Sequence, residues 1–73
     1  MDDFKQRVKQ LYSFNGYFEA FFELLPEHKT GLLAFEALER EFYEMFGKNK
    51  YADYGVFRIM KRRYILRIQK RKK

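Results

Sequence analysis

The sequence predicts an all-α domain, a small bundle of three to four short helices with a basic C-terminal helix, covering residues 1–73. Three observations predict this class. Apolar residues recur at steps of three and four, as they do on one face of an α-helix. A chain of 73 residues without cysteine can form one core but no disulfide. Nine Phe and six Tyr supply large side chains with which a short chain can fill that core.

The first helix is expected to begin at Asp3, with Gln6 completing a capping box. Its apolar face comprises Phe4, Val8, Leu11 and Tyr12. The turn-prone residues 13–16, Ser-Phe-Asn-Gly, then interrupt the helical pattern. Because the apolar spacing continues beyond them, one helix over about residues 3–25 is compatible with the sequence. The turn residues favour a break, with a second helix starting near Asn15.

The clearest helix follows the dipeptide Leu25-Pro26, which ends the preceding helical region. Thr30 is its expected N-cap and Gly47 its expected C-cap residue. One stripe of the helix contains Gly31, Ala34, Phe35, Leu38, Phe42, Met45 and Phe46. The other side is expected to be a solvated face, to which we assign Glu36, Glu39, Arg40, Glu41 and Glu44.

A linker over residues 48–52 and a capping Asp53 precede the last helix. Its core face is predicted to contain Val56, Phe57, Met60 and Tyr64, and then to fail because Arg67 and Arg71 occupy the next positions. The alternation of Tyr64, Leu66 and Ile68 with polar residues would also suit a strand. Ile65 interrupts that alternation and no partner strand is evident, so a helix is favoured. Residues 70–73 are expected to form a frayed tail.

The residue inventory argues against an enzyme. His28, Ser13 and Thr30 are each the single residue of their type, and cysteine is absent. No nucleophile and base therefore stand at a recognisable catalytic spacing, and His28 has no second imidazole or thiolate with which to bind zinc. The glycines are isolated and form no phosphate-binding motif. We expect no enzymatic activity, no cofactor and no metal, and we interpret His28 as a solvated loop residue.

The composition favours a soluble, cytoplasmic protein without a membrane partner. The acidic start, Met1-Asp2-Asp3, differs from the basic and then apolar opening of a signal peptide. No uncharged apolar run approaches the roughly 18 residues that span a bilayer. The mean hydropathy of −0.66 agrees with this expectation.

Charge is sharply segregated along the chain. Residues 1–53 contain seven Lys or Arg and all ten Asp or Glu, whereas residues 54–73 contain nine Lys or Arg and no acid. Pairs such as Arg58 with Arg62 stand four residues apart in the last helix, where like charges repel by about 0.2–0.5 kcal/mol. An external anion would relieve this repulsion. The sequence thus predicts nucleic-acid binding, mainly to phosphates, through Arg58, Lys61, Arg62, Arg63, Arg67 and Lys70.

The sequence is also compatible with other roles for the tyrosines and for the last helix. Tyr51, Tyr54 and Tyr64 could stack on unpaired bases, although core packing is the more ordinary role for Tyr64. The basic residues could instead be accommodated within the chain, by the helix dipole or by the acids of residues 36–44. A third interpretation is a protein-interaction module, either a homodimer or a complex with an acidic protein. Its interface would comprise the apolar residues off the main stripe, Ile59, Ile65, Leu66 and Ile68.

Residues 25–58 carry a further pattern. An acidic helix is followed by Phe46-Gly47 with Tyr51, and then by Tyr54 with Phe57-Arg58 at the start of the basic end. This pattern resembles short bacterial helical proteins of unknown function. The resemblance implies the same helix boundaries and carries no activity with it.

Overall fold

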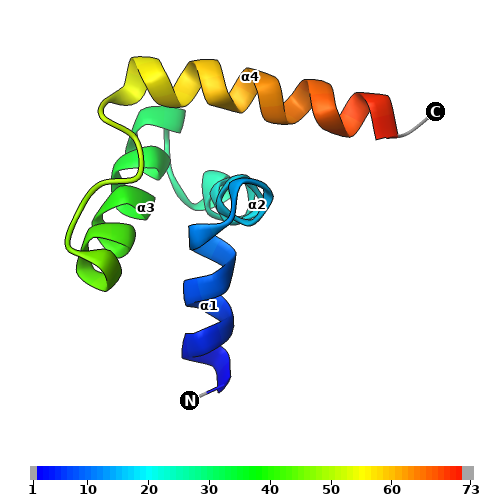
Figure 1. Ribbon diagram of the computed structural model, residues 1–73. Coiled ribbons are helices and arrows are strands. Elements are labelled where there is room, and N and C mark those ends of the chain that lie inside the picture. Colours follow the sequence, from blue (N-terminus) through cyan, green and yellow to red (C-terminus); the bar gives the residue numbers. More distant parts are fainter. Residues whose placement is uncertain (1, 72–73) are drawn as a thin grey trace.

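The computed structural model describes residues 2–71 and consists of helices. They are α1 (Asp2–Tyr12), α2 (Phe14–Leu24), α3 (Gly31–Phe46) and α4 (Tyr54–Arg71), with a short 3₁₀ helix, η1 (Leu25–Glu27), after α2. No strand occurs in the described part of the chain (Figure 1). The predicted all-α class is therefore confirmed, and the alternative of a C-terminal strand is wrong. Lys70 and Arg71 belong to α4 rather than to a frayed tail, and residues 72 and 73 lie outside the described residues.

α1 and α2 are separate helices because the chain turns at Ser13. The Ser13 hydroxyl oxygen accepts a hydrogen bond from the backbone N–H of Gly16 at 3.0 Å, which caps α2. The same hydroxyl donates to the carbonyl oxygen of Gln10 near the end of α1, at 3.1 Å. The predicted break is confirmed, and α2 begins at Phe14, one residue earlier than expected.

The apolar face of α1 is less buried than its spacing suggested. Phe4 is 62% exposed and Tyr12 is 66% exposed, whereas Leu11 is fully buried. α1 leads away from the other helices, so that its N-terminal turns have little to pack against (Figure 1). The predicted capping role of Asp3 is wrong, since α1 already begins at Asp2.

The expected caps of the two later helices are present. The Thr30 hydroxyl oxygen accepts from the backbone N–H of Leu33 at 3.1 Å at the start of α3. Gly47 ends α3 with a left-handed φ of 73°, a conformation that glycine adopts without steric penalty. At the start of α4, Oδ1 of Asp53 accepts from the backbone N–H of Val56 at 2.9 Å. The predicted boundaries of α3 and α4 rest on these three interactions.

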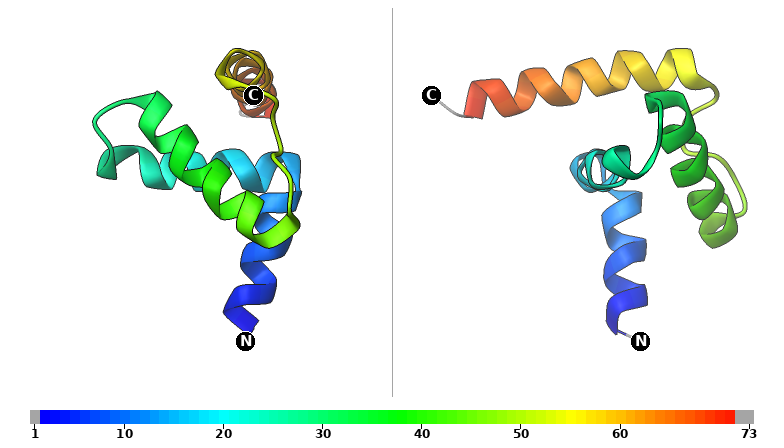
Figure 2. Two further views of the ribbon diagram at one scale, coloured as in Figure 1. Left: turned by 90° about the vertical axis from the view of Figure 1, so that its left-hand side faces the viewer. Right: turned by 180° about the vertical axis from the view of Figure 1, so that it is seen from behind.

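α2 lies at the centre of the fold. It contacts α1, α3 and α4, while α4 runs along one side of the molecule and crosses α2 (Figures 1 and 2). The C-terminal half of α4 extends beyond the other helices in Figure 1 and in the right-hand view of Figure 2. The fold therefore holds α4 through the side of the helix that faces α2.

The core is built from aromatic rings, and Phe57 of α4 is at its centre. Phe57 is fully buried, with 0% of its surface exposed. Its ring contacts rings from α2, from α3, from the linker between α3 and α4, and from α4 itself. The six neighbouring rings, with centroids 4.6–6.2 Å away, are Tyr17, Phe18, Phe21, Phe35, Tyr51 and Tyr54. Ring pairs at such distances contribute about 0.5–1.5 kcal/mol beyond their area burial. One side chain thus connects α4 to most of the core.

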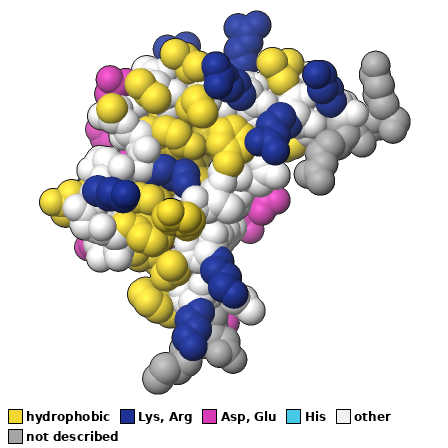
Figure 3. All heavy atoms as spheres, viewed as in Figure 1, with side chains coloured by type: hydrophobic (Ala, Val, Ile, Leu, Met, Phe, Trp, Pro, Cys, Tyr) yellow, Lys and Arg dark blue, Asp and Glu magenta, His cyan; other side chains and the backbone are white. Residues whose placement is uncertain are grey.

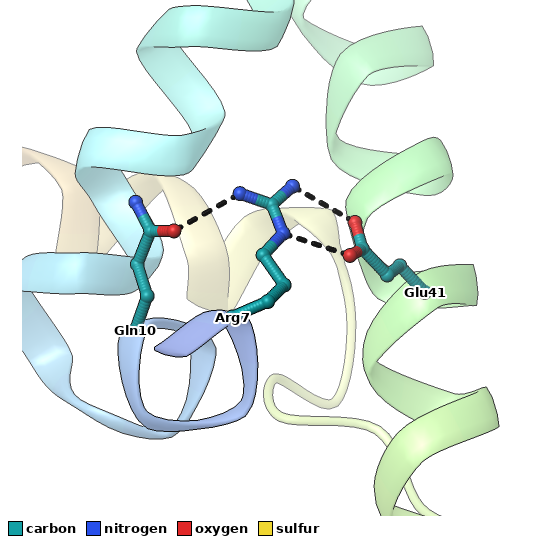
Figure 4. A network of polar contacts seen from close by, with 3 residues as sticks. All are labelled: Arg7, Gln10 and Glu41. Atoms are coloured by element: carbon teal, nitrogen blue, oxygen red, sulfur yellow. Dashed lines mark hydrogen bonds and ion pairs between the residues drawn. The ribbon is translucent and has the colours of Figure 1, made fainter. Parts of the chain in front are cut away.

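One ion pair connects α1 to α3. The guanidinium of Arg7 donates to both carboxylate oxygens of Glu41, at 2.8 and 2.9 Å, and to the side-chain oxygen of Gln10 at 3.1 Å (Figure 4). The prediction that Glu41 belongs to a solvated face is therefore wrong, although Glu36 and Glu44 are exposed as expected. Because the pair is partly exposed, its contribution is about 1 kcal/mol or less.

The junction between α1 and α2 generates a stability prediction. A Cβ atom at Gly16 would overlap the carbonyl oxygen of Gln10 and lie 2.9 Å from its carbonyl carbon, both of which belong to the backbone. We expect Gly16→Ala to reduce the free energy of unfolding by about 1–3 kcal/mol, because backbone must shift to make room. Urea denaturation followed by circular dichroism measures this loss.

Gly55→Ala is the matched control. A Cβ at Gly55 meets only the side-chain Oδ1 of Asp53, at 3.2 Å. We expect a change within about 1 kcal/mol, because alanine favours helix more than glycine does. Equal losses in the two variants would contradict the assigned close approach at Gly16.

Candidate nucleic-acid interface

α4 is held in place by an inward face that extends further than predicted. Tyr64 is 7% exposed, and its ring lies 5.2 Å from that of Phe18 and 6.1 Å from that of Phe22. Ile68, one helical turn later, is partly buried against the core. The assignment of Ile68 to an exposed interface is therefore wrong, because the core face continues through it rather than through Arg67. The side chain of Arg71 lies outside the described residues.

The exposed surface of α4 carries five of the six predicted basic residues. Of the six, Lys61 is partly buried and the others are exposed, namely Arg58, Arg62, Arg63, Arg67 and Lys70. Figure 3 shows Lys and Arg side chains spaced along α4 with hydrophobic groups between them. The structure thus brings all six predicted residues onto one element.

Two of these cations rest on aromatic rings of α2. The ammonium nitrogen of Lys61 lies 5.7 Å from the ring centroid of Phe21, and the guanidinium carbon of Arg67 lies 5.1 Å from that of Phe14. Such cation–π contacts contribute about 0.5–1 kcal/mol at exposed sites. They hold the positively charged ends of Lys61 and Arg67 against the fold.

None of the described α4 cations forms an ion pair with a carboxylate. Among the described side chains, those of residues 3–70, Arg7 with Glu41 is the ion pair found at 4 Å or less. Neutralisation by the acids of residues 36–44 was an alternative explanation of the basic helix, and it is wrong for this part of the chain. The positive charge of α4 is accessible to an external anion.

The helical spacing arranges the five exposed basic residues in two rows. At 3.6 residues per turn, Arg58 and Arg62 lie in one row, and Arg63, Arg67 and Lys70 lie in another. Ile59 and Leu66, seven residues apart, lie between the rows and are 59% and 50% exposed. We call these two side chains the apolar ridge.

A surface depression lies beside the start of the ridge. It is lined by Gly55, Arg58, Ile59, Lys61 and Arg62. Three of these five residues are cationic, and Gly55 adds no side chain to fill the space. Basic residues from successive turns of α4 therefore make up most of its lining.

The three tyrosines proposed to stack on bases are unsuited to that role. Tyr51 and Tyr64 are 9% and 7% exposed. Tyr54 is partly buried, with its ring 5.5 Å from that of Phe35 and 5.9 Å from that of Phe57. The prediction of base stacking is wrong for all three, because the aromatic core uses their faces. No exposed residue of the described part of α4 is aromatic.

A buried carboxylate fixes the linker that leads into α4. Glu39 is 5% exposed and accepts hydrogen bonds from the hydroxyl of Tyr17 and, at 3.1 Å, from the backbone N–H of Lys50. The solvated role predicted for Glu39 is therefore wrong. Its spacing from the core residues Phe35 and Phe42, at steps of four and three, was the signal that placed it on the apolar stripe.

The side chain of Lys50 adds a second attachment. Its ammonium group donates to the carbonyl oxygen of Tyr12 at 2.6 Å, at the end of α1. It also lies 5.4–5.6 Å from the ring centroids of Tyr12, Tyr17 and Phe42. Burial lowers the pKa of Lys50, while the nearby Glu39 opposes that shift. No local sequence pattern indicates this attachment, because it depends on how α1 and α3 approach each other.

Comparison with protein-family models, with curated proteins and with solved structures found no match. In the described residues, no helix combines the length and apolar character needed to cross a bilayer. In the same residues, no three His, Asp or Glu side chains are grouped so that they could hold a metal ion. The basic surface of α4 is therefore the feature from which a function can be inferred.

The environment of Tyr51 predicts a loss of stability at high pH. Burial, with a smaller contribution from the negative Glu39, raises the pKa of Tyr51 to about 12. The unfolded chain loses this proton near pH 10, so between pH 10 and 12 the unfolded state binds fewer protons and is favoured. We expect the wild type to lose about 2 kcal/mol more than Tyr51→Phe over this range.

Urea denaturation of both proteins at several pH values from 8 to about 12 measures this difference. The comparison isolates Tyr51, because Tyr51→Phe removes one hydroxyl and leaves the other side chains unchanged. A difference in stability that stays constant across the range would contradict the raised pKa of Tyr51.

Proposed function

We propose that the protein binds nucleic acid without catalysing a reaction, and that α4 contacts the phosphates. The observation that carries the proposal is the set of accessible cations on α4, none of which has a carboxylate partner in the described chain. Phosphate contacts from Lys and Arg supply most of the affinity of sequence-independent nucleic-acid binding. The contact residues are Arg58, Lys61, Arg62, Arg63, Arg67 and Lys70.

The chemistry of the side chains supports phosphate as the ligand group. Two N–H groups of one arginine guanidinium can donate to two phosphate oxygens at once, and four of the six contact residues are arginines. The depression beside Ile59 is lined by Arg58, Lys61 and Arg62, so a phosphate bound there would lie among basic residues. Binding would also relieve the repulsion between Arg58 and Arg62 and between Arg63 and Arg67.

A second candidate function is self-association through the same face. Ile59, Ile65 and Leu66 are 59%, 37% and 50% exposed, which is a substantial apolar surface for one helix. A symmetric pair of α4 helices would, however, bring two sets of arginines together. This electrostatic penalty favours nucleic acid over a homodimer as the partner of α4.

Salt dependence tests the first function. If about four phosphates are neutralised, the slope of log affinity against log salt on duplex DNA should lie near −3 to −4. Arg62→Glu should weaken binding about tenfold or more at low salt and make the slope less steep by about one or two. Fluorescence anisotropy with a labelled oligonucleotide measures both quantities.

Lys5→Glu is the matched control, because it makes the same charge change on exposed α1, away from α4. It should change affinity about threefold or less, through net charge alone. Absence of binding to duplex and single strands at low salt would overturn the proposed function. Equal weakening by the two reversals would show that binding does not use α4.

Sedimentation equilibrium tests the second function. A homodimer formed through α4 predicts a mass that rises with protein concentration, and this rise should disappear in Leu66→Glu, which places a charge in the apolar contact. Arg62→Glu should leave such an apolar dimer largely intact, whereas it should weaken nucleic-acid binding. A strict monomer at high concentration would rule out self-association.

A further inference from the structure

We propose that the outward face of α4 binds the major groove of duplex DNA, in preference to single strands or duplex RNA, with the apolar ridge of Ile59 and Leu66 against the base edges. This inference rests on the proposed function and names the class of nucleic acid. It assigns to the ridge a role distinct from the protein interface that the sequence suggested.

Single strands fit this surface poorly. Proteins that bind unpaired nucleic acid combine a basic track with exposed aromatic rings, and each stacked base contributes strongly to binding. The rings of α4 are instead committed to the core, with Phe57 fully buried and Tyr64 7% exposed. The described outer surface of α4 offers cations and aliphatic groups but no stacking platform.

The two basic rows suit a ligand with two backbones. An α-helix with its side chains is about 10–12 Å across, and the major groove of B-DNA is about 12 Å wide. A helix lying in that groove has one phosphate backbone on each side. Arg58 and Arg62 would face one backbone, and Arg63 and Lys70 would face the other. The major groove of duplex RNA is too deep and narrow for the same approach.

Access to α4 is open in the described structure. No other helix covers its outer side, and its C-terminal half extends beyond the rest of the fold (Figures 1 and 2). The helix has 18 residues and is therefore about 27 Å long. This length is sufficient to follow the groove over several base pairs.

The apolar ridge could contact the bases, whereas the basic residues contact the phosphates. Ile59 and Leu66 lie between the rows, at the place where a helix in the groove meets the base edges. The apolar group that the major groove presents is the C5-methyl of thymine. An aliphatic ridge therefore favours A·T-rich duplexes over the same duplexes without that methyl group.

The test compares four probes of one A·T-rich sequence of about 20 base pairs, two helical turns. They are the DNA duplex, the same duplex with uracil replacing thymine, the RNA duplex and the single DNA strand. We expect the RNA duplex and the single strand to bind at least about tenfold more weakly than the DNA duplex. Uracil should weaken binding about fivefold.

The double variant Ile59→Ala/Leu66→Ala should lose the preference for thymine while still binding DNA. Leu32→Ala/Leu33→Ala is the matched control, since it removes similarly exposed leucines from α3 and should keep the thymine preference. Circular dichroism establishes that both variants are folded.

The outcomes distinguish the major-groove inference from the proposed binding of phosphates. Equal affinity for all four probes would overturn the major-groove inference and leave phosphate binding intact. A thymine preference that survives in the double variant would overturn the role of the ridge. Absence of binding to every probe would overturn the proposed function itself.

Discussion

The burial of Phe57 is the constraint on which the rest of the structure depends. Its ring meets six others, drawn from α2, α3, the linker and α4. A chain of 73 residues without disulfides has little other means of fixing an 18-residue helix that extends past its neighbours. Tyr64 and Ile68 extend the inward face, so that the direction of α4 is set as well as its start. The basic residues become a coherent surface because these apolar ones are inside.

The buried Glu39 has a complementary role. A carboxylate among aromatic rings is unfavourable unless its oxygens are hydrogen-bonded, and both are, by Tyr17 and by the backbone of Lys50. Those two partners belong to α2 and to the linker before α4. The ammonium group of Lys50 then joins the linker to the end of α1. Polar groups thus determine how the linker lies, whereas aromatic packing supplies most of the stabilising contact.

Local sequence signals predicted the helices well, because caps act within one turn. Ser13, Thr30, Gly47 and Asp53 are all placed as turn and cap chemistry requires. Side-chain environments were harder to predict when they depend on how helices cross. Tyr51 and Glu39 are buried because α2 and α3 meet the linker, and Tyr64 and Ile68 are shielded because α4 crosses α2. The basic residues were predictable as a group, whereas the position of the apolar ridge between two rows required the regular helix.

The segregation of charge has a consequence for how the molecule meets a polyanion. Acids outnumber bases in residues 1–53, and exposed Glu36 and Glu44 lie on α3 rather than on α4. The molecule therefore has a large electric dipole moment in addition to its net charge. In the field of a polyanion it experiences a torque that turns α4 forward before any contact forms. If nucleic acid is the partner, as proposed, collisions would be oriented in advance, and association would be faster than the same charge spread evenly would allow.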